Sequence, residues 1–184
     1  MSPFTDKEIE YLRGQRLGRM ATTGGNGAPH IVPVGFRLDS DTGTIQIGGH
    51  GLSKSKKWRD LQANPKIAFV VDDLATMDPW TPRGIEVRGT AELHHEGGEQ
   101  IFGGGGWDSA WFAVVPQRII SWGIEGPVFS EAGRSARSVT TELPRFAQPG
   151  TCRCGKAPAV KSLTAAGSGS DAAMQLAVTG PGRP

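Results

Sequence analysis

The chain has 184 residues, 37% of them hydrophobic and 21% charged, which is enough for one domain with a hydrophobic core. Its net charge of +2 hides an asymmetry, because residues 130–184 carry seven basic and three acidic side chains whereas residues 1–129 carry 13 and 15. A slightly acidic main part argues against a general nucleic-acid binder, and no run of about 18 apolar residues suggests a membrane span. The charged N-terminus lacks an apolar secretory signal, so we expect a cytoplasmic protein.

A capping box near the N-terminus predicts the first helix. The side chain of Thr5 would accept a hydrogen bond from the backbone of Glu8, whose side chain would reach back to Thr5. Phe4 and Ile9 stand at the positions of a hydrophobic staple. We therefore expect a short helix at about residues 5–13.

Asn26-Gly27 predicts a β-hairpin directly after this helix, because this dipeptide suits the tight turn between two strands. The two strands are expected at residues 17–23 and 28–38. The second strand contains two prolines, which cannot donate hydrogen bonds within a sheet. It is therefore expected at an edge, at a bulge or beside a ligand.

The remaining elements follow from alternating or continuous apolar runs. In chain order, they are a strand at 44–48, a helix at 53–63, a strand at 66–71 buried on both sides, a loop at 74–83, an alternating strand at 84–95, a helix near 108–113 and a strand at 117–126. With the hairpin, these make six strands. Evenly spaced strands joined by hairpins predict a mainly β protein, a barrel with a few short α-helices.

Residues 130–184 lack these patterns. Only eight of these 55 residues are Val, Ile, Leu, Met or Phe, which is too little apolar surface to offset the entropy of ordering. We therefore expect a folded domain at residues 1–129 and a disordered segment, rich in Gly, Ala, Ser and Pro, at 130–184. The two cysteines, Cys152 and Cys154, lie in that segment without nearby histidines, and no metal site is predicted.

Positive charge is concentrated at the start of the helix expected at 53–63. Lys54, Lys56, Lys57 and Arg59 fall within six positions. Cations are unfavourable near the positive end of a helix dipole, whereas the N–H groups at that end bind anions. The cations either form a solvated face or bind an anion, and their position favours the anion.

The order of segments around this helix resembles a known family. A strand is followed by the glycine-rich bend "IGGHG", the helix start "SKSKKWRDL", Asn64-Pro65 and a second strand. Together with "RLGRMATTGGNGAPHIVPVGF", "DPWTPRGIEVRGTAEL" and "RIISWGIEG", these segments resemble the flavin and deazaflavin oxidoreductases of the pyridoxamine 5'-phosphate oxidase-like superfamily. Within it, they are most similar to the actinobacterial group that uses the deazaflavin coenzyme. The resemblance covers about residues 4–126 and implies a six-stranded FMN-binding split β-barrel.

The resemblance also implies that the start of the helix binds the phosphate of the cofactor. Ser55, Lys56 and Lys57 match the family's phosphate-binding step, and Lys57 is the preferred ligand because it adjoins Trp58 on the side facing the barrel. The strand at 31–35 lies against the cofactor ring in such proteins; an ordinary edge strand is the alternative. The complete set of expected cofactor-binding residues is Val32, Pro33, Val34, Gly35, Gly49, His50, Ser53, Lys54, Ser55, Lys56, Lys57, Arg59, Trp80 and Trp122.

Three residues of this set have a second interpretation. His50 ends a strand near the expected phosphate, but a lone histidine is more often structural or solvated, so a catalytic role is not favoured. Trp80 and Trp122 either wall the cofactor cleft or anchor the core or a dimer. No catalytic residue is assigned.

The sequence has no pattern for a Ser-His-Asp relay, a metal cluster or a paired acid dyad, which suits an enzyme whose cofactor carries the chemistry. The resemblance implies hydride transfer between a deazaflavin coenzyme of the F-420 type and a small electrophilic organic substrate. Two alternatives remain: an FMN-dependent oxidase of the pyridoxamine 5'-phosphate type, and a non-catalytic carrier of flavin, deazaflavin or haem. The resemblance further implies a homodimer with the cofactor at its interface, and neither nucleic acid nor a membrane is expected as a partner.

Overall fold

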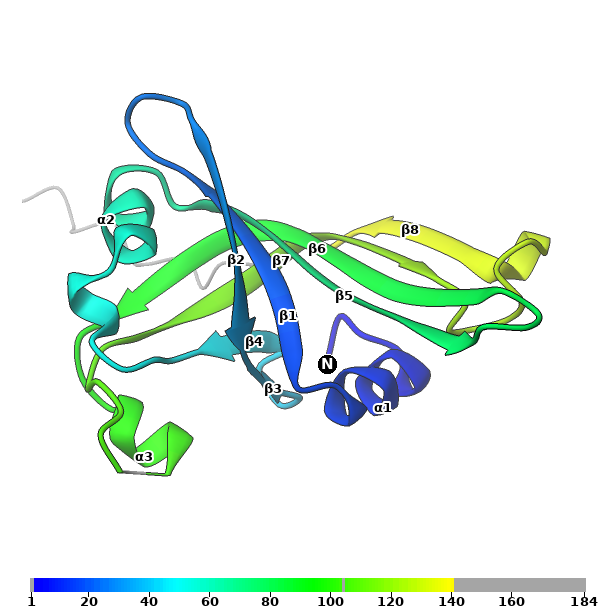
Figure 1. Ribbon diagram of the computed structural model, residues 1–184, viewed down its shortest axis with the longest axis horizontal. Coiled ribbons are helices and arrows are strands. Elements are labelled where there is room, and N and C mark those ends of the chain that lie inside the picture. The colour runs from blue at the N-terminus through cyan, green and yellow to red at the C-terminus, as the bar shows by residue number, and fades with distance from the viewer. Residues whose placement is uncertain (1, 104, 141–184) are drawn as a thin grey trace, which may run out of the picture. The chain divides into compact units, whose positions relative to one another are not determined.

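The computed structural model describes residues 2–103 and 105–140 of the chain (Figure 1). Within them, no helix has the length and apolar character needed to cross a membrane. The elements are, in chain order, α1 (Asp6–Gly14), β1 (Leu17–Thr23), β2 (Pro29–Gly35), β3 (Arg37–Asp39), β4 (Thr44–Ile47), the 3₁₀ turn η1 (Leu52–Lys54), α2 (Lys56–Ala63), β5 (Lys66–Thr76), β6 (Thr81–His94), α3 (Gly98–Phe102), β7 (Trp111–Trp122), the 3₁₀ turn η2 (Glu131–Gly133) and β8 (Arg134–Ser138).

The strands form one curled antiparallel sheet of eight strands, a split β-barrel (Figure 1). The order is β2-β1-β5-β6-β7-β4-β3, and β8 pairs with the part of β7 that β4 leaves open. β2 is therefore an edge strand, as its prolines predicted. It pairs with β1 from Thr23 opposite Pro29 to Leu17 opposite Gly35.

The expected number of six strands is too low by two. The strand predicted at 28–38 is divided at Phe36, because the chain there leaves β1 and continues as β3, which pairs with β4 instead. The other additional strand is β8. The mainly β architecture with a few short helices is confirmed.

The segment at residues 74–83, expected to be a loop, is the end of a long hairpin. β5 and β6 continue on either side of the turn at 77–80. Asp73 and Arg83 stand opposite each other, and the guanidinium of Arg83 donates to both oxygens of Asp73 at 3.0 and 2.7 Å. Cross-strand pairing thus overrides a local composition that is typical of turns.

The prediction of a helix near residues 108–113 is also wrong. The short helix α3 lies earlier in the chain, and β7 has already begun at Trp111. Phe112 pairs with Leu93 of β6 on one side and with Ile47 of β4 on the other. Partners on both sides hold the segment extended, whatever its local preference.

The N-terminal helix confirms the capping box. The Glu8 N–H donates to the hydroxyl of Thr5 at 3.2 Å, and the Thr5 N–H donates to Glu8 Oε2 at 3.0 Å. The helix begins at Asp6 and ends at Gly14, one residue later at each end than the expected range.

The folded part of the chain continues beyond the predicted boundary at residue 129. Arg137 of β8 reaches Glu8 of α1, where its Nη1 donates to Oε1 at 3.0 Å and its Nη2 bonds to Oε2. The side chain of Glu8 is 0% exposed. Burial acts to raise the pKa of Glu8, but the hydrogen bonds from Arg137 and from the Thr5 backbone outweigh it and hold this pKa below its ordinary value of 4.5.

The prediction of disorder from residue 130 onward is therefore wrong for residues 131–138. Strand pairing with β7 and the buried ion pair supply the stabilisation that their polar composition did not suggest. Residues 141–184, with Cys152 and Cys154, lie outside the described residues, and disorder there stays a prediction.

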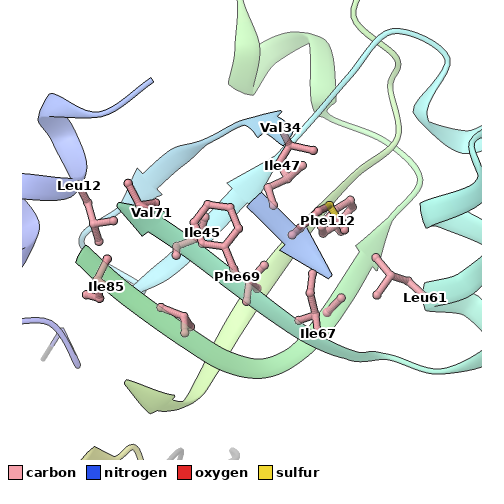
Figure 2. Packing of buried hydrophobic residues seen from close by; sticks show 14 of the residues in the cluster. Leu12, Val34, Ile45, Ile47, Leu61, Ile67, Phe69, Val71, Ile85 and Phe112 are labelled. Carbon is pink, nitrogen blue, oxygen red and sulfur yellow. The ribbon is translucent and has the colours of Figure 1, made fainter. Parts of the chain in front are cut away.

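The barrel encloses one hydrophobic core, to which the strands and the first two helices contribute (Figure 2). Ile67, Phe69 and Val71 of β5 point into it and are buried. Ala68 and Val70 occupy the opposite face of β5 and are partly exposed, so this strand is buried on one face rather than on two. A continuous apolar run does not distinguish these cases when the outward residues are small.

Candidate cofactor-binding site

The helix α2 starts directly after η1, and one of its faces is buried. Ser55 caps the helix, because its Oγ accepts a hydrogen bond from the Trp58 N–H at 3.3 Å. α2 therefore begins at Lys56 rather than near residue 53, and the residues before the cap form η1. Trp58 and Leu61 are 3% and 1% exposed, which confirms the predicted inward face. Their burial fixes the orientation of the basic first turn.

The four cations of this turn have different surroundings. Lys56 Nζ donates to both oxygens of Asp60, at 2.9 and 2.7 Å. Arg59 is exposed, and its Nη1 donates to the backbone oxygen of Lys54 at 3.4 Å. Lys57 is half-buried, and its ammonium makes no hydrogen bond or ion pair with residues 2–103 or 105–140. Of the two adjacent lysines, Lys57 is thus the one available to a ligand.

Asp60 is a buried carboxylate beneath the helix. Its side chain is 8% exposed, and its Oδ2 accepts a hydrogen bond from the Thr22 hydroxyl at 3.1 Å. Nδ1 of His30, a buried atom without a hydrogen-bond partner in the described part of the chain, lies 3.8 Å from Oδ2. The hydrogen bond from Lys56 is the main cause that holds the pKa of Asp60 below its ordinary value of 3.8. Asp60 therefore ties α2 to β1 and faces His30 of β2.

Ser53 donates to an aspartate from a distant segment. Asp108 Oδ2 accepts from the N–H and the hydroxyl of Ser53 at 2.9 and 2.7 Å, and Oδ1 accepts from the Ala110 N–H at 3.2 Å. The Asp108 N–H donates to the Gly49 oxygen at 3.0 Å. The hydrogen bonds from Ser53, with a smaller effect of the Lys54 charge, lower the pKa of Asp108 below 3.8. An ionised carboxylate therefore stands at the start of η1.

His50 lies against the loop that follows α3. Its Nδ1 donates to the Gly106 oxygen at 2.6 Å. The imidazole stacks on Trp107 with ring centroids 5.2 Å apart, and Trp107 stacks on Phe102 at 5.0 Å. Among residues 2–103 and 105–140, no group of three or more His, Cys, Asp or Glu side chains could hold a metal ion.

The residues expected near the cofactor ring alternate between the two faces of β2. Val34 is buried and Val32 packs against the core, whereas Pro33 and Gly35 are exposed. A side chain added at Gly35 would meet no atom closer than 4.0 Å. A planar group could therefore approach the edge strand at Pro33 and Gly35 and would meet Val32 and Val34 only through their backbone.

Trp80 and Trp122 lie apart from the start of α2. Trp80 is 58% exposed at the turn between β5 and β6, and the ring of Trp122 covers Gly84, where an added Cβ would come within 2.2 Å of it. β5 has 11 residues, which span roughly 36 Å, and it runs from the end of α2 to the turn that contains Trp80. A single copy of the chain does not bring Trp80 to the basic turn.

A groove of about 1050 Å³ opens between α1, β3 and α3. Its walls combine aromatic side chains (Phe36, Phe102 and Trp107) with charged ones of both signs (Arg13, Arg16, Arg37, Asp39 and Asp41). Arg37 is held in place because its Nη1 donates to the Ile101 oxygen of α3 at 2.8 Å. The groove also includes Gly35, so it adjoins the exposed end of β2. Its volume suits a small organic molecule.

Asp60, Asp108 and the groove were not found from the sequence. Lys56 and Asp60 are four residues apart on a helix, and this spacing could have indicated their ion pair. Asp108 is 55 residues from Ser53, and no local spacing relates them. The groove residues come from three separated segments, so only the folded chain reveals their proximity.

Comparison with known proteins places these features in a family context. The family model described as Pyridoxamine 5'-phosphate oxidase matches residues 4–116. The chain is 42% identical over 140 residues to the 5a,11a-dehydrotetracycline/5a,11a-dehydrooxytetracycline reductase of Streptomyces rimosus. This match covers 76% of the present chain and 96% of that reductase.

Solved structures show a similar fold at lower sequence identity. A conserved hypothetical protein of Mycobacterium tuberculosis matches 65% of this chain and 85% of its own length, with 23% identity and a TM-score of 0.52. A heme binding protein of Mycobacterium smegmatis matches 72% of this chain and 57% of its own length, with 14% identity and a TM-score of 0.54. At these identities, the likeness concerns the fold alone.

Proposed function

The chain belongs to the pyridoxamine 5'-phosphate oxidase family, and we propose that it is a reductase that passes a hydride from a deazaflavin coenzyme of the F-420 type to an electrophilic organic substrate. Its similarity to a reductase makes it an oxidoreductase of this family. The observation that carries the proposal of a phosphate-bearing cofactor is the basic first turn of α2, with Lys57 half-buried and unpaired among the described residues. The preference for deazaflavin over FMN rests on the resemblance of the sequence segments.

The proposed roles of the residues follow from their surroundings. Lys57, with Lys54 and Arg59, binds the phosphate at the positive end of α2. The ring lies along the edge strand at Pro33 and Gly35, where few side-chain atoms stand in its way. The bound coenzyme supplies the hydride, and the protein fixes the distance and orientation of the substrate.

The groove beside β2 is the proposed place for the substrate. Its aromatic side chains, Phe36, Phe102 and Trp107, suit a planar molecule through stacking, and its arginines suit a polar or anionic oxygen. The relative from Streptomyces rimosus is named for the reduction of dehydrotetracyclines. For this chain, we propose only the substrate class, an unsaturated polycyclic compound.

A homodimer would complete this site. The outer sheet face carries Ile31, which is 68% exposed, and two shallow grooves that both include Ala68. A two-fold symmetric partner would cover this apolar face. Because Trp80 lies far from α2 of its own chain, it would reach the cofactor, with Trp122, only in the partner. Light scattering with and without cofactor tests this assembly.

Titration of the purified chain with the deazaflavin coenzyme, FMN and haemin, followed by absorbance, tests the proposed function. We expect the tightest binding for the deazaflavin, and its oxidation when an enone or quinone acceptor is added to the reduced complex. Preferred binding of FMN with turnover of pyridoxamine 5'-phosphate would favour the oxidase instead. Binding of haemin without turnover would favour a carrier, and binding of none of the three would contradict the proposal.

A further inference from the structure

The groove between α1, β3 and α3 has an uneven distribution of charge. Its lining includes three arginines and two aspartates, which leaves one positive charge in excess. Arg13 lies beside the turn that carries both aspartates, because its Nη2 donates to the Oγ of Ser40 at 2.9 Å. Ser40 stands between Asp39 and Asp41 in the chain. The charge of Arg13 is therefore offset in part by carboxylates of the groove itself.

Arg37 is also engaged by groups of the protein. Its Nη1 donates to the Ile101 oxygen at 2.8 Å. Burial acts to raise the pKa of Asp39, but hydrogen bonds from Thr42 and from the Asp41 backbone, with a smaller effect of the Arg37 charge, hold this pKa below its ordinary value of 3.8. Arg37 thus faces an ionised carboxylate and a carbonyl of α3, and both reduce its attraction for a ligand.

Arg16 is the third arginine of the groove, and its surroundings differ. Its side chain is exposed, and its guanidinium makes no hydrogen bond or ion pair with residues 2–103 or 105–140. The backbone oxygen of Arg16 is the atom nearest to a Cβ built at Gly35, at 4.0 Å. Arg16 therefore adjoins the open end of β2, and its guanidinium is available to a ligand in the groove.

The aromatic wall of the groove is fixed by the segment that follows β4. The ring of Phe102 packs on Gly48, where an added Cβ would come within 2.5 Å of it. Trp107 stacks between Phe102 and His50, with ring centroids 5.0 and 5.2 Å away. Phe102 and Trp107 remain half-buried, so part of each ring is open to the groove. A planar ligand can contact these rings without displacing them.

We propose that Arg16 determines the specificity of the groove, and that it selects those unsaturated polycyclic compounds that carry an ionised oxygen, such as a carboxylate or an enolate. The inference rests on the proposed function, because that function makes the groove the substrate site. The planar body of the ligand contacts Phe102 and Trp107, and its ionised oxygen accepts hydrogen bonds from the guanidinium of Arg16. A neutral polycyclic compound keeps the aromatic contacts and lacks the ion pair.

Anthraquinone-2-carboxylate and anthraquinone-2-carboxamide are the probes, since they share a planar body and differ in charge. Equilibrium dialysis against the purified full-length chain at neutral pH measures both affinities. We expect the wild type to bind the carboxylate about three- to fivefold more tightly than the carboxamide, the upper part of the range for an exposed ion pair. Arg16→Gln should bind the two equally, with its affinity for the carboxamide unchanged. Arg16→Lys should keep part of the preference, because it retains the charge without the planar fork.

Two further variants locate the effect. Phe102→Ala should weaken the binding of both probes by a similar factor and leave their ratio unchanged, which places the shared planar body at the aromatic wall. Arg134→Gln removes an exposed arginine of β8, outside the groove, and should keep the preference of the wild type. High salt should reduce that preference, because Arg16 is exposed and its charge is screened.

Equal affinities of the wild type for the two probes, an undiminished preference in Arg16→Gln, or binding of neither probe would overturn the inference. A failure of the proposed function is distinguishable from these results. It would appear as missing deazaflavin and flavin binding in a chain that still shows the preference conferred by Arg16.

Discussion

Two carboxylates are buried against helices in different regions of the molecule, and each is paired with one basic side chain. Glu8 of α1 bonds to Arg137 of β8, 129 residues away, whereas Asp60 of α2 bonds to Lys56 one helical turn earlier. Lys56 stays half-exposed beside other cations, while the Glu8 carboxylate is closed to solvent. The same chemical pair joins distant segments in the first region and offsets part of the positive charge of a helix start in the second.

The largest effect is expected when the first pair is broken. Arg137→Ala leaves the buried Glu8 carboxylate without its cation, and the free energy of unfolding should fall by about 3–5 kcal/mol. Urea unfolding at neutral pH measures this change. Arg134→Ala, an exposed position on the same strand, is the matched control and should change stability by less than about 0.5 kcal/mol. A loss equal to that of the control would show that β8 contributes little to the folded state.

A smaller effect, on binding instead of folding, is expected in the second region. Lys57→Ala should weaken binding of the deazaflavin coenzyme by about 1.5–3 kcal/mol, the usual range for a charge-assisted hydrogen bond. Equilibrium titration followed by absorbance measures the affinity, and thermal unfolding should be nearly unchanged. Lys7→Ala on α1 removes an exposed lysine elsewhere and should bind like the wild type. Equal affinities of Lys57→Ala and the wild type would exclude Lys57 as the phosphate ligand.

Lowering the pH should weaken the ion pair of Glu8 and Arg137, because it protonates Glu8. Because the folded-state pKa of Glu8 is depressed below 4.5, its ionised form contributes stability that is fully present above pH 4.5. This contribution is lost as the pH falls through the folded-state value. The stability gap between the wild type and Glu8→Gln should therefore narrow as the pH falls through this acid range. Thermal unfolding from neutral to acidic pH measures it, and a gap independent of pH would refute the coupling.

The smallest effect is expected for the local pair. Lys56→Met should change cofactor affinity by about 0.5 kcal/mol or less, because Lys56 is already engaged by Asp60. It should lower the free energy of unfolding by about 1 kcal/mol, because the carboxylate of Asp60, 8% exposed, loses its cation and keeps only the hydroxyl of Thr22. The affinity is measured in parallel with that of Lys57→Ala. If the two variants weaken binding equally, both lysines contact the anion and the distinction between them fails.

Features that depend on a few neighbouring residues could be predicted from the sequence. The capping box of Thr5 and Glu8, the hairpin turn at Asn26-Gly27 and the buried face of Trp58 and Leu61 each follow from residues at most three positions apart. The charge cluster at the start of α2 was visible for the same reason. The strand pattern predicted a barrel, and resemblance to a family added the split-barrel type and the expected cofactor, which no local pattern contains.

Features that depend on distant pairing could not be predicted. Phe112 is extended because β6 and β4 flank it, and the segment around Arg137 is ordered because β7 and Glu8 receive it. Likewise, the sequence singled out Lys57 among the four lysines and arginines, but only the folded chain assigns Asp60 to Lys56 and Asp108 to Ser53. Charge and spacing along a chain determine which groups could bind an anion. Which of them already have partners is decided by the sheet and loops that bring distant carboxylates to them.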